Sequence, residues 1–273
     1  MKTVKYIWLL GLLALWLAGE PLFAVAARST IFVTYGQAGT MTPPTTLSGV
    51  STYSFNNLPL GVNSSVNWEE VGNFQTVNVA SANSNGGASG SQYMADGLNG
   101  VTQTTLTLNT ASSYLGLWLS AVNSSEVIDF YSKSGSLLAE FTTANLLKAL
   151  PTTYYGNPNS GTLHGTDPTQ PFAYVNFLAT SDVAWSSVVF KDSAGGGTFQ
   201  ADNVATRSKA YNPSSDGAMP GIQFEMITNG VETAIAIAPE PNPVLATLLI
   251  GGISAGGSIL RRIRTPSSKA VLA

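Results

Sequence analysis

The middle of the chain, residues 29–238, is a succession of short segments rich in β-branched and aromatic residues, separated by loops of Gly, Asn, Pro and Ser. Such segments are typical of β-strands, and the separators are typical of turns. Strands do not alternate with long helical segments, and no repeat of fixed period is evident, which argues against parallel α/β, solenoid and propeller folds. The middle therefore predicts an all-β fold, an antiparallel β-sandwich of jelly-roll type.

The pattern predicts many strands and one helix. Thr142 or Thr143 caps a helix expected over residues 144–150, which ends at Pro151. Residues 133–136 have the composition of a hairpin turn. The expected strands are 31–35, 50–55, 73–79, 104–108, 114–120, 126–131, 137–141, 172–179, 184–191, 197–201, 222–227 and 232–238.

The formal net charge of −3 averages over three parts of unlike sign. Residues 29–238 carry five basic and thirteen acidic side chains, whereas the segments on either side are basic and apolar. A domain that binds nucleic acid carries a basic patch, so this acidic middle argues against nucleic acid as a partner. The absence of cysteine excludes disulfide scaffolds, zinc fingers and cysteine nucleophiles, and no cofactor is predicted.

The N-terminus has the three parts of a secretory signal peptide. Lys2 and Lys5 supply the positive region, residues 6–18 form an uncharged run, and the small residues of an A-x-A site follow at 24–26. As a helix this run rises about 20 Å, less than a hydrocarbon core of roughly 30 Å, which favours a cleaved signal over a membrane anchor. We therefore predict a signal peptide over residues 1–27 and export by the Sec machinery.

The C-terminus has the pattern of a second export element. Pro239-Glu240-Pro241 precedes an uncharged run of 17 residues, 244–260, which is predicted to be a transmembrane helix. An arginine cluster follows directly and is formed by Arg261, Arg262 and Arg264. The positive-inside rule keeps this cluster and the tail, residues 265–273, in the cytoplasm. The middle domain, residues 28–238, is then expected outside the cytoplasm.

This order of elements, on a chain with a signal peptide, resembles the PEP-CTERM sorting signal. The resemblance covers residues 239–264. It implies that an exosortase, an integral-membrane processing enzyme of bacteria that typically make exopolysaccharide, is a partner of the chain. It also implies that Pro239, Glu240 and Pro241 are the recognition motif, and that the arginine cluster holds the precursor in the inner membrane before the mature form reaches the cell surface.

A second resemblance lies in the middle of the chain. The segments Tyr114–Trp118, Val127–Tyr131 and Leu137–Phe141 are similar to the β-sandwich passengers of cyanobacterial-type exosortase-dependent surface proteins, the Npun_F0296-type group. The likeness covers residues 114–205 and brings no catalytic residue with it. The sequence therefore predicts a non-enzymatic protein of the cell surface or extracellular matrix.

An alternative interpretation is a carbohydrate-binding module associated with exopolysaccharide. Aromatic side chains offer large, flat apolar surfaces, and such surfaces stack on sugar rings. Trp118 and Trp185 lie on apolar strands and are expected in the core. The candidate sugar-stacking residues in more open positions are Trp68, Tyr154 and Tyr155.

Catalytic and metal chemistry have less support in the residue pattern. A third interpretation is a secreted hydrolase, with His164 as a general base near Asp167. His164 lies in a loop with no identified nucleophile, so the sequence offers no set of catalytic residues for this interpretation. Glu126 and Asp129 are three apart on a predicted strand and point to opposite faces, which argues against a glycosidase pair. Two Gly-rich loops offer oxygen ligands for calcium, without EF-hand spacing, and ordinary turns explain both. The candidate ligands are Asp96, Asn99, Asp192 and Asp202.

Overall fold

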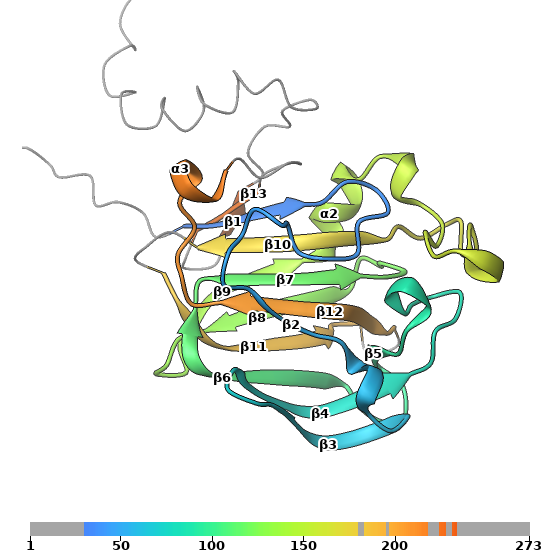
Figure 1. The fold of residues 1–273 in the computed structure, drawn as a ribbon, viewed down its shortest axis with the longest axis horizontal. Helices are drawn as coiled ribbons and strands as arrows, with labels where there is room; N and C mark the ends of the chain where they lie inside the picture. Colours follow the sequence, from blue (N-terminus) through green and yellow to red (C-terminus); the bar gives the residue numbers. More distant parts are fainter. Residues whose placement is uncertain (1–29, 180–182, 195–196, 218–223, 228–230, 234–273) are drawn as a thin grey trace, which may run out of the picture.

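The computed structural model describes residues 30–179, 183–194, 197–217, 224–227 and 231–233 (Figure 1). These residues are mainly β, and their strands join into one 14-stranded antiparallel sheet that curls into a half-barrel. The expectation of an all-β antiparallel fold is confirmed at this level. The predicted signal peptide, transmembrane helix and cytoplasmic tail lie outside the described residues.

The strands follow the chain in short, evenly spread segments. Their bounds are β1 Thr30–Tyr35, β2 Ser51–Tyr53, β3 Gly61–Trp68, β4 Gly72–Ala80, β5 Tyr93–Asp96, β6 Gln103–Ser112, β7 Tyr114–Leu119, β8 Glu126–Tyr131, β9 Leu137–Thr142, β10 Ala173–Ala179, β11 Trp185–Asp192, β12 Phe199–Arg207, β13 Phe224–Ile227 and β14 Val231–Thr233.

Neighbours in the sheet are mostly distant in sequence. The order is β14-β13-β1-β10-β7-β12-β5-β4-β6-β11-β8-β9, with β2 paired to β12 and β3 paired to β4. Every strand pair is antiparallel. The β8–β9 hairpin turns at Gly135, whose φ of +79° is readily adopted by glycine. This turn confirms the predicted hairpin.

Helical structure is confined to short pieces at the margins of the sheet. The predicted helix is confirmed as α2, Thr143–Ala149, with Thr142 at its N-cap position. A one-turn helix, α3, covers Pro213–Asp216. The 3₁₀ turns are η1 Phe55–Asn57, η2 Ala88–Gly90, η3 Thr152–Tyr154 and η4 Gly161–Leu163.

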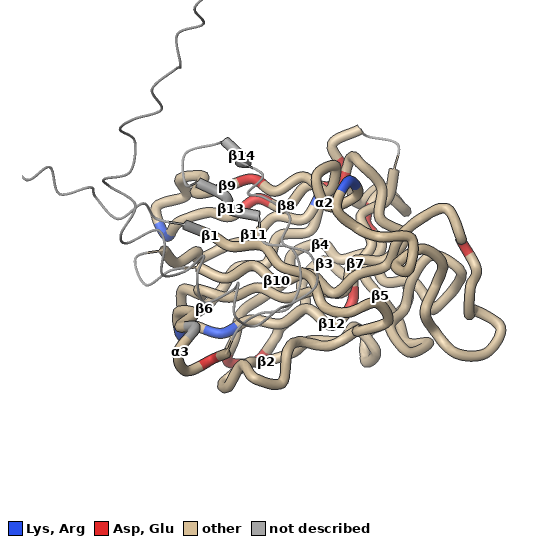
Figure 2. The backbone as a smooth tube through the Cα atoms, turned by 90° about the horizontal axis from the view of Figure 1, so that it is seen from above, with Lys and Arg blue, Asp and Glu red and all other residues tan. Residues whose placement is uncertain are grey.

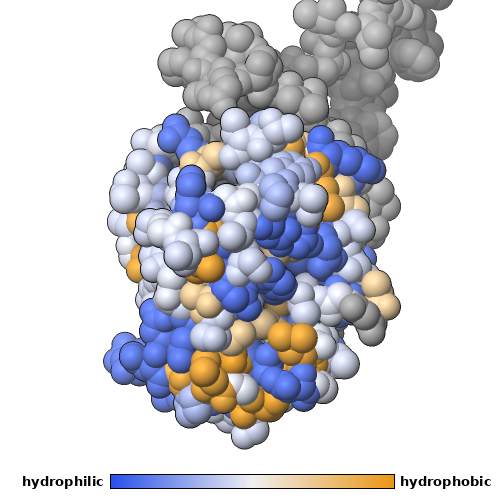
Figure 3. All heavy atoms as spheres, turned by 90° about the vertical axis from the view of Figure 1, so that its right-hand side faces the viewer, coloured by the Kyte–Doolittle hydropathy of each residue, from blue (hydrophilic) through white to orange (hydrophobic). Residues whose placement is uncertain are grey.

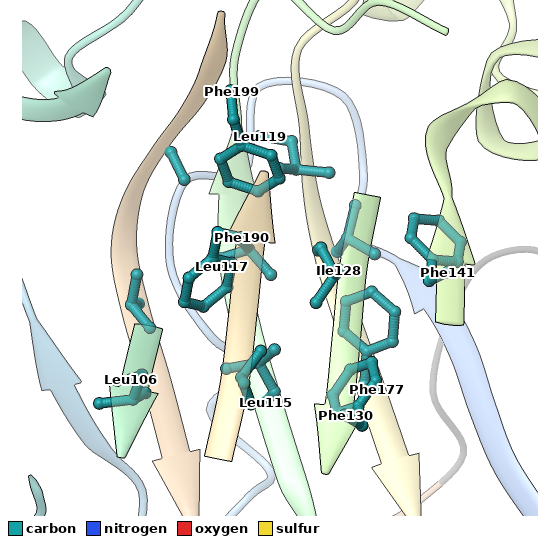
Figure 4. Packing of buried hydrophobic residues seen from close by; sticks show 14 of the residues in the cluster. Leu106, Leu115, Leu117, Leu119, Ile128, Phe130, Phe141, Phe177, Phe190 and Phe199 are labelled. Atoms are coloured by element: carbon teal, nitrogen blue, oxygen red, sulfur yellow. The ribbon is translucent and has the colours of Figure 1, made fainter. Parts of the chain in front are cut away.

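An aromatic core lies between the two halves of the curled sheet (Figure 4). The ring centroid of Phe177 on β10 lies 5.0 Å from that of Phe130 on β8 and 5.0 Å from that of Phe141 on β9. In the order of strands β10 lies far from β8 and β9, so these contacts exist only because the sheet curls back on itself. Phe190 of β11 and Phe199 of β12 bridge the halves in the same way, with centroids 5.5 Å apart.

Alternation along the strands separates core from surface. On β6, Thr104, Leu106 and Leu108 are buried, while Thr107 and Asn109 are exposed. Because successive side chains of a strand point to opposite faces, β6 has one apolar face and one polar face. The central strands β7 and β10 are buried along their whole length, since loops cover their outer face as well. Trp118 and Tyr174 pack there against Phe172.

The sequence pattern did not predict two of the strands, β3 and β5. Half of the eight residues of β3 are Asn or Ser, which have low strand propensity, so only its pairing with β4 along seven residue pairs identifies it. β5 has only four residues, too few for a periodic pattern. β12 also continues to Arg207, beyond the expected end at residue 201.

Replacing Phe177 with alanine should lower the free energy of unfolding by about 3–5 kcal/mol, because it leaves a cavity at the contact between the two halves of the sheet. Leu137→Ala is the control, since Leu137 is 47% exposed and its loss should change stability by no more than about 0.5 kcal/mol. Urea unfolding followed by tryptophan fluorescence measures both. Equal effects of the two substitutions would show that Phe177 does not hold the halves together.

Candidate functional site

The residues of the predicted sorting signal lie outside the described part of the chain. This applies to Pro239, Glu240 and Pro241 and to Arg261, Arg262 and Arg264. Within the described part, no helix combines the length and the apolar character needed to cross a bilayer. In the middle domain, buried carboxyl groups lie at the start of β8, at the end of β5 and within β12, and belong to Glu126, Asp96 and Asp202.

A network of polar side chains surrounds Glu126 where β8 begins. Asn123 Nδ2 donates to Glu126 Oε1 at 3.2 Å and to the Thr198 carbonyl oxygen at 3.2 Å. Thr143 Oγ1 donates to the Glu126 carbonyl at 3.2 Å and also to the Asn123 carbonyl. The network therefore ties the β7–β8 loop to the start of α2 and the start of β12.

Asp192 closes the same network from β11. Ser125 Oγ donates to Asp192 Oδ2 at 2.7 Å, and the backbone N–H of Ala194 donates to Asp192 Oδ1 at 2.8 Å. A Cβ atom at Gly197 would lie 2.2 Å from Asp192 Oδ2, so a larger residue there would displace the Asp192 carboxylate from its present position. Sequence reasoning missed Asn123, Ser125 and Gly197, because nothing in their local sequence places them beside the two carboxyl groups.

Burial decides the protonation of three carboxyl groups. The pKa of Glu126 is raised well above its usual value by burial, with backbone hydrogen bonding at Asn123 opposing the rise and the Asp192 charge adding to it. Burial likewise raises the pKa of Asp96 to about 7 and that of Asp202 to about 6, against hydrogen bonds that favour the ionised forms. The free-energy cost of removing the ionised carboxyl group from water exceeds the stabilisation that these hydrogen bonds give it.

Glu126 and Asp129 enter separate networks, in line with their expected opposite orientation. Asp129 Oδ2 lies 2.5 Å from Lys191 Nζ, with the Asp129 side chain 3% exposed and that of Lys191 30% exposed. Tyr131 donates its hydroxyl to the same carboxylate oxygen at 3.3 Å. This ion pair lies on the outer face of β8 and β11, away from the core.

The four residues that the sequence offered as candidate calcium ligands, in two loops, make hydrogen bonds to different protein groups. Asp96 Oδ1 accepts from Thr104 Oγ1 at 2.9 Å, and Asn99 Nδ2 donates to Asn78 Oδ1 at 2.8 Å. Asp202 accepts from the Ala88 N–H at 3.0 Å. Over the described ranges, no three His, Asp or Glu side chains are placed to hold a metal ion. Asp96 and Asp202 thus accept hydrogen bonds from strand and loop residues, and Asp96 Oδ2 is buried without a hydrogen-bond partner.

The aromatic residues proposed for sugar stacking are not a surface group, which corrects the expectation for two of them. Trp68 is 7% exposed and stacks on Phe74, with ring centroids 5.7 Å apart. Tyr154 is 8% exposed and donates its hydroxyl to the Gly36 carbonyl at 2.8 Å. Tyr155 is 36% exposed. The two residues are covered by different partners, since Trp68 packs against Tyr53 of β2 and Phe74 of β4, while Tyr154 of η3 packs on Tyr35 of β1.

His164 lies in an exposed loop. Its Nδ1 lies 3.2 Å from the Asn159 carbonyl oxygen, while Asp167 Oδ1 accepts from Thr169 Oγ1 at 3.4 Å. The nearby polar groups thus serve loop geometry rather than a pair of His164 with Asp167. Asn157 adds to this loop structure by donating to the carbonyls of Asn83 and Ser84.

A buried ion pair fastens the last described helix to the sheet. Arg207 on β12 contacts Asp216 of α3 through two hydrogen bonds, Nη1 to Oδ1 at 3.1 Å and Nη2 to Oδ2 at 2.6 Å. Both side chains are 1% exposed. The hydrogen bond from Arg207 lowers the pKa of Asp216 to about 2. This latch holds the segment after β12 against the domain.

Comparisons with known proteins add little to this geometry. Protein-family models give no match, and neither do the curated proteins. Among solved structures, the chain is similar to the catalytic domain of a GH87 alpha-1,3-glucanase variant in complex with tetrasaccharides, with 13% sequence identity and a TM-score of 0.31. The match covers 68% of this chain and 30% of that chain, so this protein spans less than a third of that structure. No conclusion about activity rests on it.

The pKa shifts predict two opposite pH dependences. The pKa of Asp96 is raised in the folded state, so its contribution to stability is present below pH 4 and is lost as the pH rises to about 7. The pKa of Asp216 is lowered to about 2, so its contribution is present above pH 4 and is lost as the pH falls.

Asp96→Asn should therefore become more stable relative to the unchanged protein as the pH rises from 4 to 7, by at most about 1.4 kcal/mol per pH unit. Asp216→Asn should be destabilising at pH 7 and lose that effect between pH 4 and 2. Urea unfolding at several pH values measures both. Parallel curves for the unchanged protein and Asp96→Asn between pH 4 and 7 would contradict the assignment.

Proposed function

We propose that the protein is a non-enzymatic, exported protein of the bacterial cell surface or extracellular matrix, targeted by a C-terminal PEP-CTERM signal for exosortase processing. One observation carries the proposal, namely the order of Pro239-Glu240-Pro241, the apolar run 244–260 and the arginine cluster, together with the signal-peptide pattern of residues 1–27. Each part occurs by chance in many proteins, and their order together is far more specific.

The proposal assigns a role to each segment. Residues 1–27 direct export through the Sec machinery, and 244–260 hold the precursor in the inner membrane, with 265–273 in the cytoplasm. The exosortase then acts near Pro239–Pro241. The segment 28–238 is the passenger, a β-sandwich of jelly-roll type, which reaches the surface or the extracellular matrix.

The chemistry of the middle domain supports a passenger without catalytic activity. The carboxyl groups of Asp96, Glu126 and Asp202 are buried, and their hydrogen bonds come from the protein itself. A catalytic acid or base must reach its substrate, and these groups do not face solvent. Of the three aromatic residues suggested for the carbohydrate-binding alternative, only Tyr155 is exposed. Stronger support for that alternative comes from the outward face of β3, β4 and β6.

Replacing Pro239, Glu240 and Pro241 with alanine should abolish C-terminal processing in a host that carries an exosortase. The precursor should stay in the inner membrane and be larger by the mass of the uncleaved C-terminal segment, because the recognition motif is lost. Immunoblotting of cell fractions with intact-mass analysis of the purified protein measures both properties.

Pro168→Ala is the matched control, since it removes an exposed proline from a loop of the middle domain and should leave processing unchanged. A second control is the unchanged protein in a host without an exosortase, where the C-terminal segment should remain attached. Normal processing of the triple-alanine variant would refute the sorting proposal.

A further inference from the structure

The outward face of β3, β4 and β6 is made of neutral hydrogen-bonding side chains. The inward positions of these strands hold Val66, Phe74 and Leu106 in the core. The alternate positions therefore point outward, and the side chains there are half-buried or exposed. They are all amides or hydroxyls, namely Ser65 and Asn67 on β3, Asn73 and Gln75 on β4, and Thr105 and Thr107 on β6.

Strand register aligns these side chains in two rows across the sheet. The first row, called the polar row, runs over five neighbouring strands and consists of Asn67, Asn73, Thr107, Ser187 and Tyr131. The second row runs beside it through Ser65, Gln75, Thr105 and Val189. At a strand spacing of about 4.8 Å the polar row is about 19 Å long, and the rows lie about 7 Å apart.

The polar row is ordered by the protein itself. Asn73 Nδ2 donates to Ser65 Oγ at 2.9 Å, which fixes the orientation of that amide between the two rows. Tyr131 at one end is held by its bond to Asp129, so its ring is fixed relative to the neighbouring strands. Side chains already held in place lose less entropy when they bind a ligand.

Charge is nearly absent from this part of the molecule. Residues 29–125 contain three charged side chains, Glu69, Glu70 and Asp96, and Asp96 is buried. Charged residues are few along the described chain (Figure 2), and strands β3 and β4 contain none. At the far end of the rows, Lys191 pairs with Asp129, and the exposed Glu140 on β9 lies beside Asp129, so this end carries one unpaired acidic charge. A charged polymer would find no opposite charge on β3, β4 and β6 to bind. A neutral polymer needs no such charge, so its binding would not be weakened by the absence.

We infer that this face, with the polar row at its centre, binds a neutral polysaccharide. Amide and hydroxyl side chains both donate and accept hydrogen bonds, which matches the hydroxyl groups of sugars. The fixed ring of Tyr131 offers a partly exposed aromatic surface at one end of the row for the apolar face of a sugar. The inference goes beyond the sorting proposal and gives the carbohydrate-binding alternative a surface different from Trp68, Tyr154 and Tyr155.

A second copy of the chain is the competing occupant. Protein interfaces have an apolar core, and the polar rows lack one. The most exposed large apolar side chains of the described residues lie at the end of the sheet, where Leu60 is 58% and Val62 is 51% exposed, while Leu137, 47% exposed, pairs with Tyr131 at the end of the polar row. Figure 3 shows hydrophobic surface gathered at the lower part of that end of the molecule. Self-association would thus be expected at this end rather than on the face of the polar rows.

The test is affinity electrophoresis of the purified full-length chain in gels that contain dextran, laminarin or the anionic polymer alginate. Retardation by a neutral glucan is expected, with apparent affinity at least tenfold lower for Asn73→Ala/Thr107→Ala. Thr107→Ser should keep most of the binding, because it retains the hydroxyl. The matched control is Ser160→Ala/Thr162→Ala, which removes two exposed hydroxyls from a loop and should bind like the unchanged protein.

Three results would overturn the inference. They are the absence of retardation by either neutral glucan, stronger retardation by alginate, or equal binding by the Asn73→Ala/Thr107→Ala variant. Sedimentation velocity without polysaccharide provides a further check, since a dimer that dissociates in the Thr107→Arg variant would assign this face to a second copy. None of these results affects C-terminal processing, so failure here is distinguishable from failure of the sorting proposal.

Discussion

The contact of Phe177 with Phe130 and Phe141 is the interaction on which the rest of the structure depends. It joins strands that are far apart along the hydrogen-bonded path and so converts a long sheet into a curled one with an interior. Backbone hydrogen bonds between strands determine which strands are neighbours, but they do not determine how strongly the sheet curves. Burial of apolar rings, at roughly 25 cal/mol for each Å² removed from water, supplies the driving force that brings the halves together.

Curling has a consequence for the polar groups at the end of the sheet. The start of β8, the end of β11 and the start of β12 meet there, and their loops must satisfy buried backbone and side-chain groups. Asn123 and Ser125 do so by bonding to Glu126 and Asp192. The raised pKa of Glu126 is a result of this closure, because burial removes the carboxyl group from water. These carboxyl groups therefore belong to the architecture.

Side chains on the outer face of the sheet do not have to satisfy buried polar groups, so they can interact with the surroundings. Ser65, Asn73 and Thr107 are not needed to fill the core, and a charge-free polar array is unusual on an otherwise acidic domain. Acidic net charge keeps a protein soluble, while neutral hydroxyl and amide groups allow approach of an uncharged polymer. A sorting signal that delivers the domain to a polysaccharide-rich exterior, and a face suited to that material, form one consistent proposal.

The sequence by itself determined the class of the fold and most of the strands. Alternation on β6 and the apolar runs of β7 and β10 are local properties, and so are the cap at Thr142 and the turn at Gly135. The proposed sorting signal also depends on local order alone. Strand β3 was missed because its Asn and Ser residues carry no strand signal, and it forms only against β4.

Tertiary structure alone decided which side chains meet. Trp68 and Tyr154 changed from surface candidates to core residues because residues distant in sequence, Tyr53 and Tyr35, pack against them. Asp96, Asn99, Asp192 and Asp202 form hydrogen bonds with different partners. The polar row likewise joins residues from 67 to 187 that share no sequence pattern. The physical reason is that strand register and sheet curvature depend on the sum of many distant contacts, which no local window of sequence contains.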